Sequence, residues 1–249
     1  MTGLIEVIDG GLGNAIQDAG RFGYRHQGLA VSGFLDRPLA DCANALAGNP
    51  PATACIEMRG LGPTLAVRSG PLRVALAGNV AATILRANGS SQTLLAWQSA
   101  TLEDHDSLKV GAVAGGTAYL AVSGGCTVPR QLGSRSTYQR AEIGCPIVFG
   151  LQIPCATVSG GGAGEFAAAP WLPDEGLIRV IPGPQDDHFS PAAMADLFGQ
   201  EYRVTPQSDR MGIRLDGKSL AHRAPAMADI VSDGVTPGVI QVPGNGQPI

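Results

Sequence analysis

The residues of this sequence that could do chemistry begin with the run Gln17-Asp18-Ala19-Gly20-Arg21 near the N-terminus. The guanidinium of Arg21 can hold a carboxylate through two parallel hydrogen bonds, and Asp18 can orient it or accept a proton. Gly20 and Gly23 would let the backbone approach a ligand closely. The alternative is a surface turn in which Asp18 pairs with Arg21, and on residue types alone such a turn is the more common outcome.

Two further polar clusters suit an anion. In Gly133-Ser134-Arg135-Ser136-Thr137, two serine hydroxyls lie close to a guanidinium in sequence. The alternative for this cluster is a solvated turn between strands. In Ser208-Asp209-Arg210-Met211-Gly212, a structural pair of Asp209 with Arg210 is the stronger interpretation.

The segment Gly212–Ser219 matches the phosphate-loop pattern G-x-x-x-x-G-K-S in every position. That chemistry needs a loop whose amides surround a phosphate, followed by a helix. Here the apolar residues alternate as in a strand, Asp216-Gly217 is typical of a hairpin turn, and Pro225 interrupts the expected helix. We therefore predict a β-hairpin at this segment.

Composition excludes several classes of protein. The formal net charge is -4 and the pI is near 5.5, which does not suit a protein that tracks phosphates along nucleic acid. Charged residues make up only 15% of the chain, which suggests that a partner covers part of the surface. Four scattered histidines and five cysteines without C-x-x-C spacing favour neither a metal site nor a disulfide framework. With no signal pattern and no long apolar stretch, we expect a cytoplasmic protein.

The elements that must position these residues are mostly strands. The chain has 35 glycines and 18 prolines spread in short clusters, a pattern typical of tight turns between short strands. Two short helices are predicted, one capped by Asp36 and ended by Gly48, the other opened by Ser190-Pro191 and ended by Gly199. Apolar runs bounded by turn residues predict strands at Thr64–Val67, Leu72–Ala77, Ala82–Leu85, Gln92–Leu95, Ala118–Val122 and Ile178–Ile181.

This spacing favours an all-β barrel or sandwich, with minor α content, over a parallel α/β sheet. Two glycine clusters, 111–116 and 159–164, are candidate domain breaks. We choose the first, which predicts β-rich subdomains at residues 1–110 and 111–249.

Taken together, these runs resemble the biotin-dependent carboxyltransferase A/B-subdomain family, whose members are also called allophanate hydrolase subunit 2, the C component of 5-oxoprolinase, or Kip antagonist protein. The resemblance covers nearly the whole chain in several motifs in the family's order. They are Ile16–Tyr24, Asp36, Ala43–Asn49, Glu57, Gly62-Pro63, Tyr119–Gly125, Leu132–Tyr138, Arg179–Gln185, Ser208–Leu215 and Gln241–Pro243.

The resemblance implies two cyclophilin-like β-barrel subdomains and a companion subunit that carries the C/D subdomains. It implies a subunit of an ATP-dependent 5-oxoprolinase, which opens 5-oxoproline to glutamate together with a third, barrel-type subunit. The alternative is the carboxyltransferase module of a biotin-dependent urea carboxylase or allophanate hydrolase system. Because the chain has no Met-Lys-Met, the biotin would then sit on a separate carrier. A non-enzymatic regulator that binds its companion subunit is a third hypothesis.

For a small anionic carbonyl substrate, Arg21 or Arg135 would hold the carboxylate, Asp18 would orient it or accept a proton, and turn amides would stabilise an oxyanion. The remaining predicted substrate-binding residues are Gln17, Gly20, Gly23, Asn44, Ser134, Ser136, Asp209 and Arg210.

Two departures from the family pattern are expected to matter. The family continues beyond Ile249 with a strand and an Asp-Arg-Gln-x-x-Gly-Gly-Tyr segment, so we expect a C-terminal truncation, and residues 144–152 lack a Gly-Asp turn.

Overall fold

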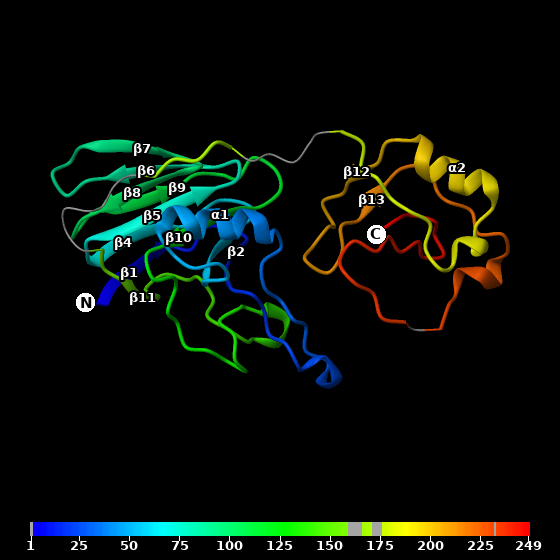
Figure 1. The fold of residues 1–249 in the computed structure, drawn as a ribbon, viewed down its shortest axis with the longest axis horizontal. Helices are drawn as coiled ribbons and strands as arrows, with labels where there is room; N and C mark the ends of the chain where they lie inside the picture. Colours follow the sequence, from blue (N-terminus) through cyan, green and yellow to red (C-terminus); the bar gives the residue numbers. More distant parts are fainter. Residues whose placement is uncertain (1, 159–165, 171–175, 232) are drawn as a thin grey trace. The chain divides into compact units, whose positions relative to one another are not determined.

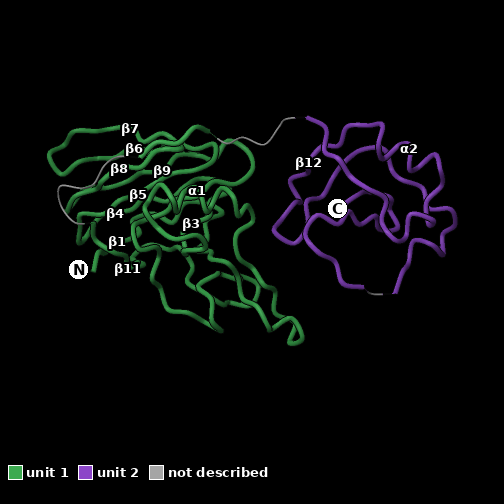
Figure 2. Tube along the Cα trace, in the orientation of Figure 1, with its two compact units in different colours: residues 1–172 green, residues 173–249 purple. Residues whose placement is uncertain are grey.

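The computed structural model describes residues 2–158, 166–170, 176–231 and 233–249. The chain forms two compact units, residues 1–172 and residues 173–249, which we describe separately (Figure 2). The glycine cluster at 159–164, our second candidate domain break, lies outside the described residues. None of the described helices is long and apolar enough to cross a membrane.

The first unit contains two antiparallel sheets (Figure 1). The larger has the strand order β11-β1-β4-β9-β6-β7. Its strands are β1 (Thr2–Asp9), β4 (Thr64–Ser69), β6 (Ala81–Leu85), β7 (Ser91–Leu95), β9 (Ser107–Val110) and β11 (Gln152–Ala156). The smaller has the order β2-β3-β10-β5-β8. Its strands are β2 (Asn14–Gln17), β3 (Cys55–Met58), β5 (Leu72–Ala77), β8 (Gln98–Leu102) and β10 (Ala118–Val122).

The core of the first unit lies between the sheets. It combines Ile5, Val67 and Ile84 of the larger sheet with Val74 and Leu120 of the smaller. The outer positions of β6 alternate with buried ones, as expected for a sheet with one solvated face. In contrast, all five residues of β10 are buried, because a helix covers the other face of the smaller sheet.

That helix is α1 (Arg37–Ala47), and its ends follow the predicted signals. The side chain of Asp36 accepts a hydrogen bond from the Leu39 N–H at 3.1 Å, and Gly48 ends the helix in the left-handed conformation at φ 81°. Its apolar face packs with Ala75, Tyr119 and other residues of β5 and β10. Two 3-10 turns, η1 (Arg25–Gln27) and η2 (Gln139–Ala141), complete the elements of this unit.

The second unit has little regular structure. It contains α2 (Pro191–Gly199), the two-residue strands β12 (Arg203–Val204) and β13 (Leu215–Asp216), and the 3-10 turns η3 (Asp186–His188) and η4 (Pro225–Ala228). Ser190 caps α2 as predicted, by accepting from the Ala193 N–H at 3.1 Å.

The predicted fold class is confirmed: the described part of the chain is mostly β, with two short α-helices. Five of the predicted strands are present as β4, β5, β6, β7 and β10. The prediction at Ile178–Ile181 was wrong, since these residues form no strand and the two isoleucines are each 89% exposed. An apolar run predicts a strand only where a partner strand is available to pair with it.

The structure differs from two other expectations, the division after residue 110 and the hairpin at Gly212–Ser219. The expected division after residue 110 falls inside the first unit, because β10 and β11 pair with strands that precede it. At Gly212–Ser219 no helix follows the glycine, as predicted, and β13 forms. However, β13 pairs with β12, which precedes it, so Asp216-Gly217 is not the turn of the hairpin.

Candidate functional site

Two long loops of the first unit carry most of the predicted site residues. We call residues 18–35, between β2 and α1, the arginine loop, and residues 123–151, between β10 and β11, the serine loop. Both extend from the strands on the same side in Figure 1, in blue and green. In the serine loop, Leu132 (φ 52°) and Gly133 (φ 80°) form a tight turn closed by hydrogen bonds between Gln131 and Ser134.

The Asp18 carboxylate joins the two loops. Its Oδ1 accepts hydrogen bonds from the hydroxyls of Ser134 and Ser136, both at 2.6 Å, and from the Gly20 N–H at 2.9 Å. Its Oδ2 accepts from the Arg135 N–H at 2.7 Å. In return, the Asp18 N–H donates to the Ser136 hydroxyl oxygen at 3.0 Å. Asp18 is 9% exposed and the two serines are almost fully buried.

These contacts determine the protonation of Asp18. Burial alone would raise the pKa of the carboxyl, but the bonds from Ser134, Ser136 and the two backbone N–H groups together lower it below the ordinary value of 3.8. A carboxylate with four donors and a lowered pKa is a poor proton acceptor near neutral pH. Three of its four donors come from the serine loop, so these bonds connect the two loops.

Arg21, in the arginine loop, is 1% exposed. Its Nε donates to the Gln131 carbonyl at 3.1 Å and its Nη2 donates to the Ser136 carbonyl at 2.8 Å. Its Nη1 is buried without a hydrogen-bond partner among the described residues. No ion pair forms between Arg21 and Asp18, so the alternative of a surface pair is not what the structure shows; both residues instead contact Ser136.

Arg135 presents a different environment. Its backbone N–H donates a hydrogen bond to Asp18, while its side chain is only partly buried. Its Nε donates to the Val128 carbonyl at 2.8 Å, which orients the guanidinium. No hydrogen bond to its Nη atoms is found within the described part of the chain. An oriented, partly exposed guanidinium of this kind can bind a carboxylate through the fork of its terminal nitrogens.

Gln17 at the end of β2 and Gly20 in the arginine loop have structural roles, whereas Gly23 does not. Gln17 is fully buried; its Oε1 accepts from the Gly33 N–H and its Nε2 donates to the Thr137 carbonyl, both at 3.1 Å. Gly20 has φ 108°, and a Cβ there would lie 2.8 Å from Val31, so this glycine allows the loop to pack on itself. Gly23 is exposed with open space around it.

The last predicted residues lie apart from this cluster. Asn44 is buried in α1, where it donates to the Thr53 carbonyl at 2.8 Å and accepts from Asn49 at 2.9 Å. Asp209 and Arg210 belong to the second unit. There Asp209 Oδ1 accepts from the Met211 N–H at 2.8 Å and shapes a turn, while burial lowers the pKa of Arg210.

Sequence reasoning missed two groups that hold the loops. Gln131 accepts from Arg21 through its backbone carbonyl, and its side chain accepts from the Gly144 N–H at 2.9 Å. Glu57 is buried and accepts from the Tyr119 hydroxyl at 2.8 Å and the Leu35 N–H at 2.9 Å, which fixes the end of the arginine loop. A contact to the backbone carbonyl of Gln131 cannot be predicted from residue types. Glu57, in contrast, is one of the residues that resemble the family's sequence, and that resemblance is the signal that could have found it.

Neither the small void inside the core nor the open hollow beside His188 in the second unit is lined by Asp18, Arg21 or Arg135. The linked loops therefore offer an oriented, partly exposed guanidinium. Such a group can hold one side of a small anion.

Comparison with known proteins gives this arrangement a context. Residues 27–249 match the model of the family described as carboxyltransferase domain, subdomain A and B. The chain is 32% identical to the 5-oxoprolinase subunit designated C of Escherichia coli K12 over 254 residues, which is 99% of this chain and 78% of that protein. It is 30% identical to urea amidolyase of Lachancea kluyveri over 233 residues, covering 85% of this chain and 12% of that one.

Among solved structures, the chain matches TTHA0988 with a TM-score of 0.83 and 30% identity. The match covers 99% of this chain and 48% of TTHA0988, so the chain spans about half of that protein. The urea carboxylase of Kluyveromyces lactis matches with a TM-score of 0.68 at 26% identity, over 89% of this chain and 21% of that one.

Proposed function

Because the chain belongs to the carboxyltransferase domain family, subdomains A and B, we propose that it is a subunit of an ATP-dependent complex that hydrolyses 5-oxoproline to glutamate. The observation that carries this proposal is its likeness, along 99% of its length, to a subunit of a 5-oxoprolinase. The chain would act in the cytoplasm and only together with its partners.

In this proposal the joined loops are the chain's contribution to the substrate site. The terminal nitrogens of Arg135 bind the carboxylate of 5-oxoproline, since the Val128 carbonyl already orients the guanidinium. Asp18 and Arg21 are positioning residues: Asp18 holds the Arg135 backbone, and Arg21 holds the Gln131 and Ser136 carbonyls. Any proton acceptor in the reaction must be another group.

The companion subunit with the C/D subdomains would cover this surface and complete a closed site. We assign the ATP site to the partners, since Gly212–Ser219 contains strand β13 and lacks the helix that a phosphate loop requires. The barrel-type subunit would complete the complex. ATP, when bound, would activate the amide of the ring for hydrolysis.

The first experiment is reconstitution of the three subunits with this chain included or left out. We expect ATP-dependent release of glutamate only from the full mixture. Turnover that is equal without the chain would reject the proposal.

The second experiment tests Arg135. In the reconstituted complex, Arg135→Met should raise KM for 5-oxoproline between about 10- and 150-fold, the range that loss of a charge-assisted hydrogen bond gives. The matched control is Arg130→Met in the same loop, which removes an exposed guanidinium and should leave KM unchanged. An equal effect of both variants would show that the general charge of the loop matters and that Arg135 has no specific contact.

A second candidate function is a carboxyltransferase that moves a carboxylate from carboxybiotin to urea. The likeness to urea amidolyase over 85% of this chain favours it. The biotin carrier would be a separate protein. Urea-dependent activity of the partner complex that avidin abolishes would support this function over 5-oxoproline hydrolysis, and activity insensitive to avidin would reject it.

A further inference from the structure

The outer edge of β7 is an unusual feature of the first unit. Each sheet of the first unit has one edge strand on either side. These are β11 and β7 in the larger sheet and β2 and β8 in the smaller. An uncovered edge offers a row of backbone donors and acceptors to any other strand, and proteins usually cover or charge it.

Three of these edges are covered by the chain itself. Beside β11, the Thr127 N–H donates to the Pro154 carbonyl at 2.8 Å. Beside β2, the Thr137 N–H donates to the Ile16 carbonyl at 2.9 Å. Beside β8, the Ser99 N–H donates to the Phe166 carbonyl at 2.8 Å. No segment among the described residues pairs with the outer edge of β7.

The backbone groups on that edge can be identified from the ladder. The Arg86 N–H donates to the Ser90 carbonyl, and Gly111 on the other side donates to the Ala81 carbonyl. Antiparallel ladders alternate, so Gln92 and Leu94 direct their backbone groups toward β6. Ser91, Thr93 and Leu95 therefore direct theirs outward, and the side chains of all three are exposed.

The same strand carries no charge. Its sequence is Ser-Gln-Thr-Leu-Leu, without lysine, glutamate or proline to deter another strand. If a second β7 pairs with it antiparallel about Thr93, Thr93 faces Thr93 and Ser91 faces Leu95. No like charges oppose one another in this register, so self-pairing meets no electrostatic penalty.

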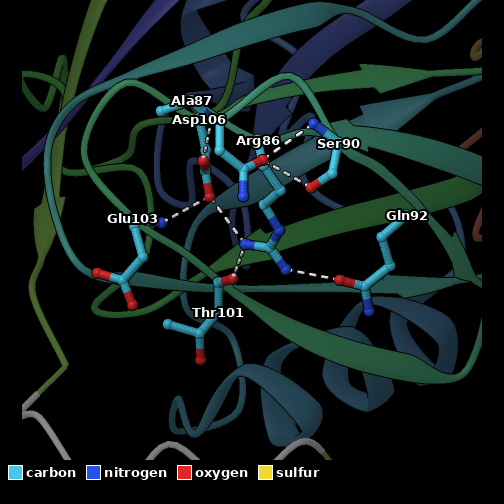
Figure 3. A network of polar contacts seen from close by, with 8 residues as sticks. Arg86, Ala87, Ser90, Gln92, Thr101, Glu103 and Asp106 are labelled. Carbon is cyan, nitrogen blue, oxygen red and sulfur yellow. Dashed lines mark hydrogen bonds and ion pairs between the residues drawn. The ribbon is translucent and has the colours of Figure 1, made fainter.

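A polar network holds the hairpin of β6 and β7 in place (Figure 3). Nη1 of Arg86 donates to Asp106 Oδ2 at 2.8 Å and to the Thr101 carbonyl at 2.7 Å, and Nη2 donates to Gln92 Oε1 at 2.6 Å. Asp106 also accepts from the Ala87 N–H at 2.9 Å. Arg86 thus connects β7 to β8 and to the turn before β9.

We propose that two copies of this chain pair through β7, antiparallel and with the two-fold axis between the two Thr93 residues. A two-fold contact uses the same patch on both copies, and this strand is compatible with itself in that register. The pairing joins two six-stranded sheets into one continuous sheet. One five-residue strand gives a small interface, so the dimer is weak and its population depends on concentration. The inference is independent of the proposed catalytic role.

Sedimentation equilibrium of the full chain between about 1 and 100 µM tests the proposed dimer. Such high concentrations are needed because protein interfaces of small area are weak. The wild type should pass from monomer to dimer. Thr93→Glu and Thr93→Lys should each weaken the dimer at least tenfold, since like charges then face each other across the axis. An equimolar mixture of the two variants should regain the dimer as a heterodimer.

The matched control is Thr83→Glu. Thr83 lies opposite Thr93 on the same outer face, but its strand is paired on both sides and it faces Lys109 on β9. This variant should dimerise like the wild type. Thermal melting of all variants separates loss of pairing from loss of folding.

A second measurement tests the register. In a hydrogen-bonded antiparallel pair the Cα atoms lie about 5.5 Å apart, which a disulfide can span. Thr93→Cys should give a covalent dimer on mild oxidation, with the cross-link located by mass spectrometry, whereas Thr83→Cys should not. A wild type that stays monomeric, or a dimer insensitive to both Thr93 charges, would overturn the proposal. So would a Thr93→Glu chain whose only defect is loss of binding to the companion subunit.

Discussion

At the scale of single residues, Asp18 shows what the sequence could and could not predict. The sequence indicated two separate polar clusters, one at Asp18 and one at Ser134-Arg135-Ser136, and the structure brings these four residues together. The role expected for Asp18 depended on which groups would face it. Four donors face it, two of them backbone N–H groups, and backbone contacts cannot be read from side-chain types.

Asp18→Asn tests this assignment through stability. The amide keeps one acceptor but places an NH₂ group where either the Arg135 N–H or the serine hydroxyls now donate. A buried donor left unpaired costs about 1 to 3 kcal/mol, so the free energy of unfolding should fall by that amount in urea titration. The control is Asp9→Asn, whose carboxylate is exposed and accepts from Gly11 alone among the described residues, and it should change stability by less than about 0.5 kcal/mol.

The pH dependence of stability follows from two lowered carboxyl pKa values. For Asp106, as for Asp18, burial opposes ionisation but hydrogen bonds from Glu103, Arg86 and Ala87 outweigh it and lower the pKa below 3.8. In acid the unfolded chain therefore takes up protons before the folded one, so stability is full well above about pH 4 and falls as pH drops through the folded pKa values. Urea unfolding between about pH 7 and pH 2.5 should show this fall, and Asp18→Asn should make it shallower. Stability that rises in acid would contradict the assignment.

At the scale of elements, local signals predicted both described helices and five of the described strands correctly. Asp36 and Gly48 mark α1, and the apolar runs at Leu72–Ala77 and Ala118–Val122 coincide with β5 and β10. These elements were predictable because their caps and patterns are contained in the segment itself. The covering of sheet edges was not, since the segments beside β2 and β8 come from residues more than about 60 positions away.

The cap of α1 gives a prediction for this scale. Asp36→Ala removes the acceptor of the Leu39 N–H and should lower the free energy of unfolding by about 1 kcal/mol, within a range of about 0.5 to 2. Asp36→Ser keeps an acceptor and should recover most of that loss. If both variants lose the same amount, the capping bond is not what stabilises this end of the helix.

At the scale of the whole molecule, the two units differ in how much apolar surface they bury. The first unit has a large core between its sheets and a second cluster under α1. In the second unit, Ala193 and Leu220 are the buried hydrophobic side chains among the described residues, while Leu177 is 98% exposed. The sequence did not predict this division, because it depends on the long-range pairing of β11 with β1 and of β10 with β3 and β5.

Hydrogen exchange of the full chain should reflect this difference. Amides of β5 and β10, whose residues are almost all buried, should exchange slowest. Amides of the second unit, α2 included, should exchange at least about a hundredfold faster, because few buried contacts must break to expose them. Equal protection in both units, measured by mass spectrometry of peptic fragments, would contradict this expectation.

The hydrogen bond between Asp18 and Ser136 also has a consequence for biosynthesis. The two residues are 118 positions apart, so the N-terminal run leaves the ribosome long before the segment that holds it has been translated. Throughout that interval Asp18 lacks the hydrogen bonds from Ser134, Arg135 and Ser136. A companion subunit of the kind proposed above could therefore recognise the joined loops only after Ser136 has been translated.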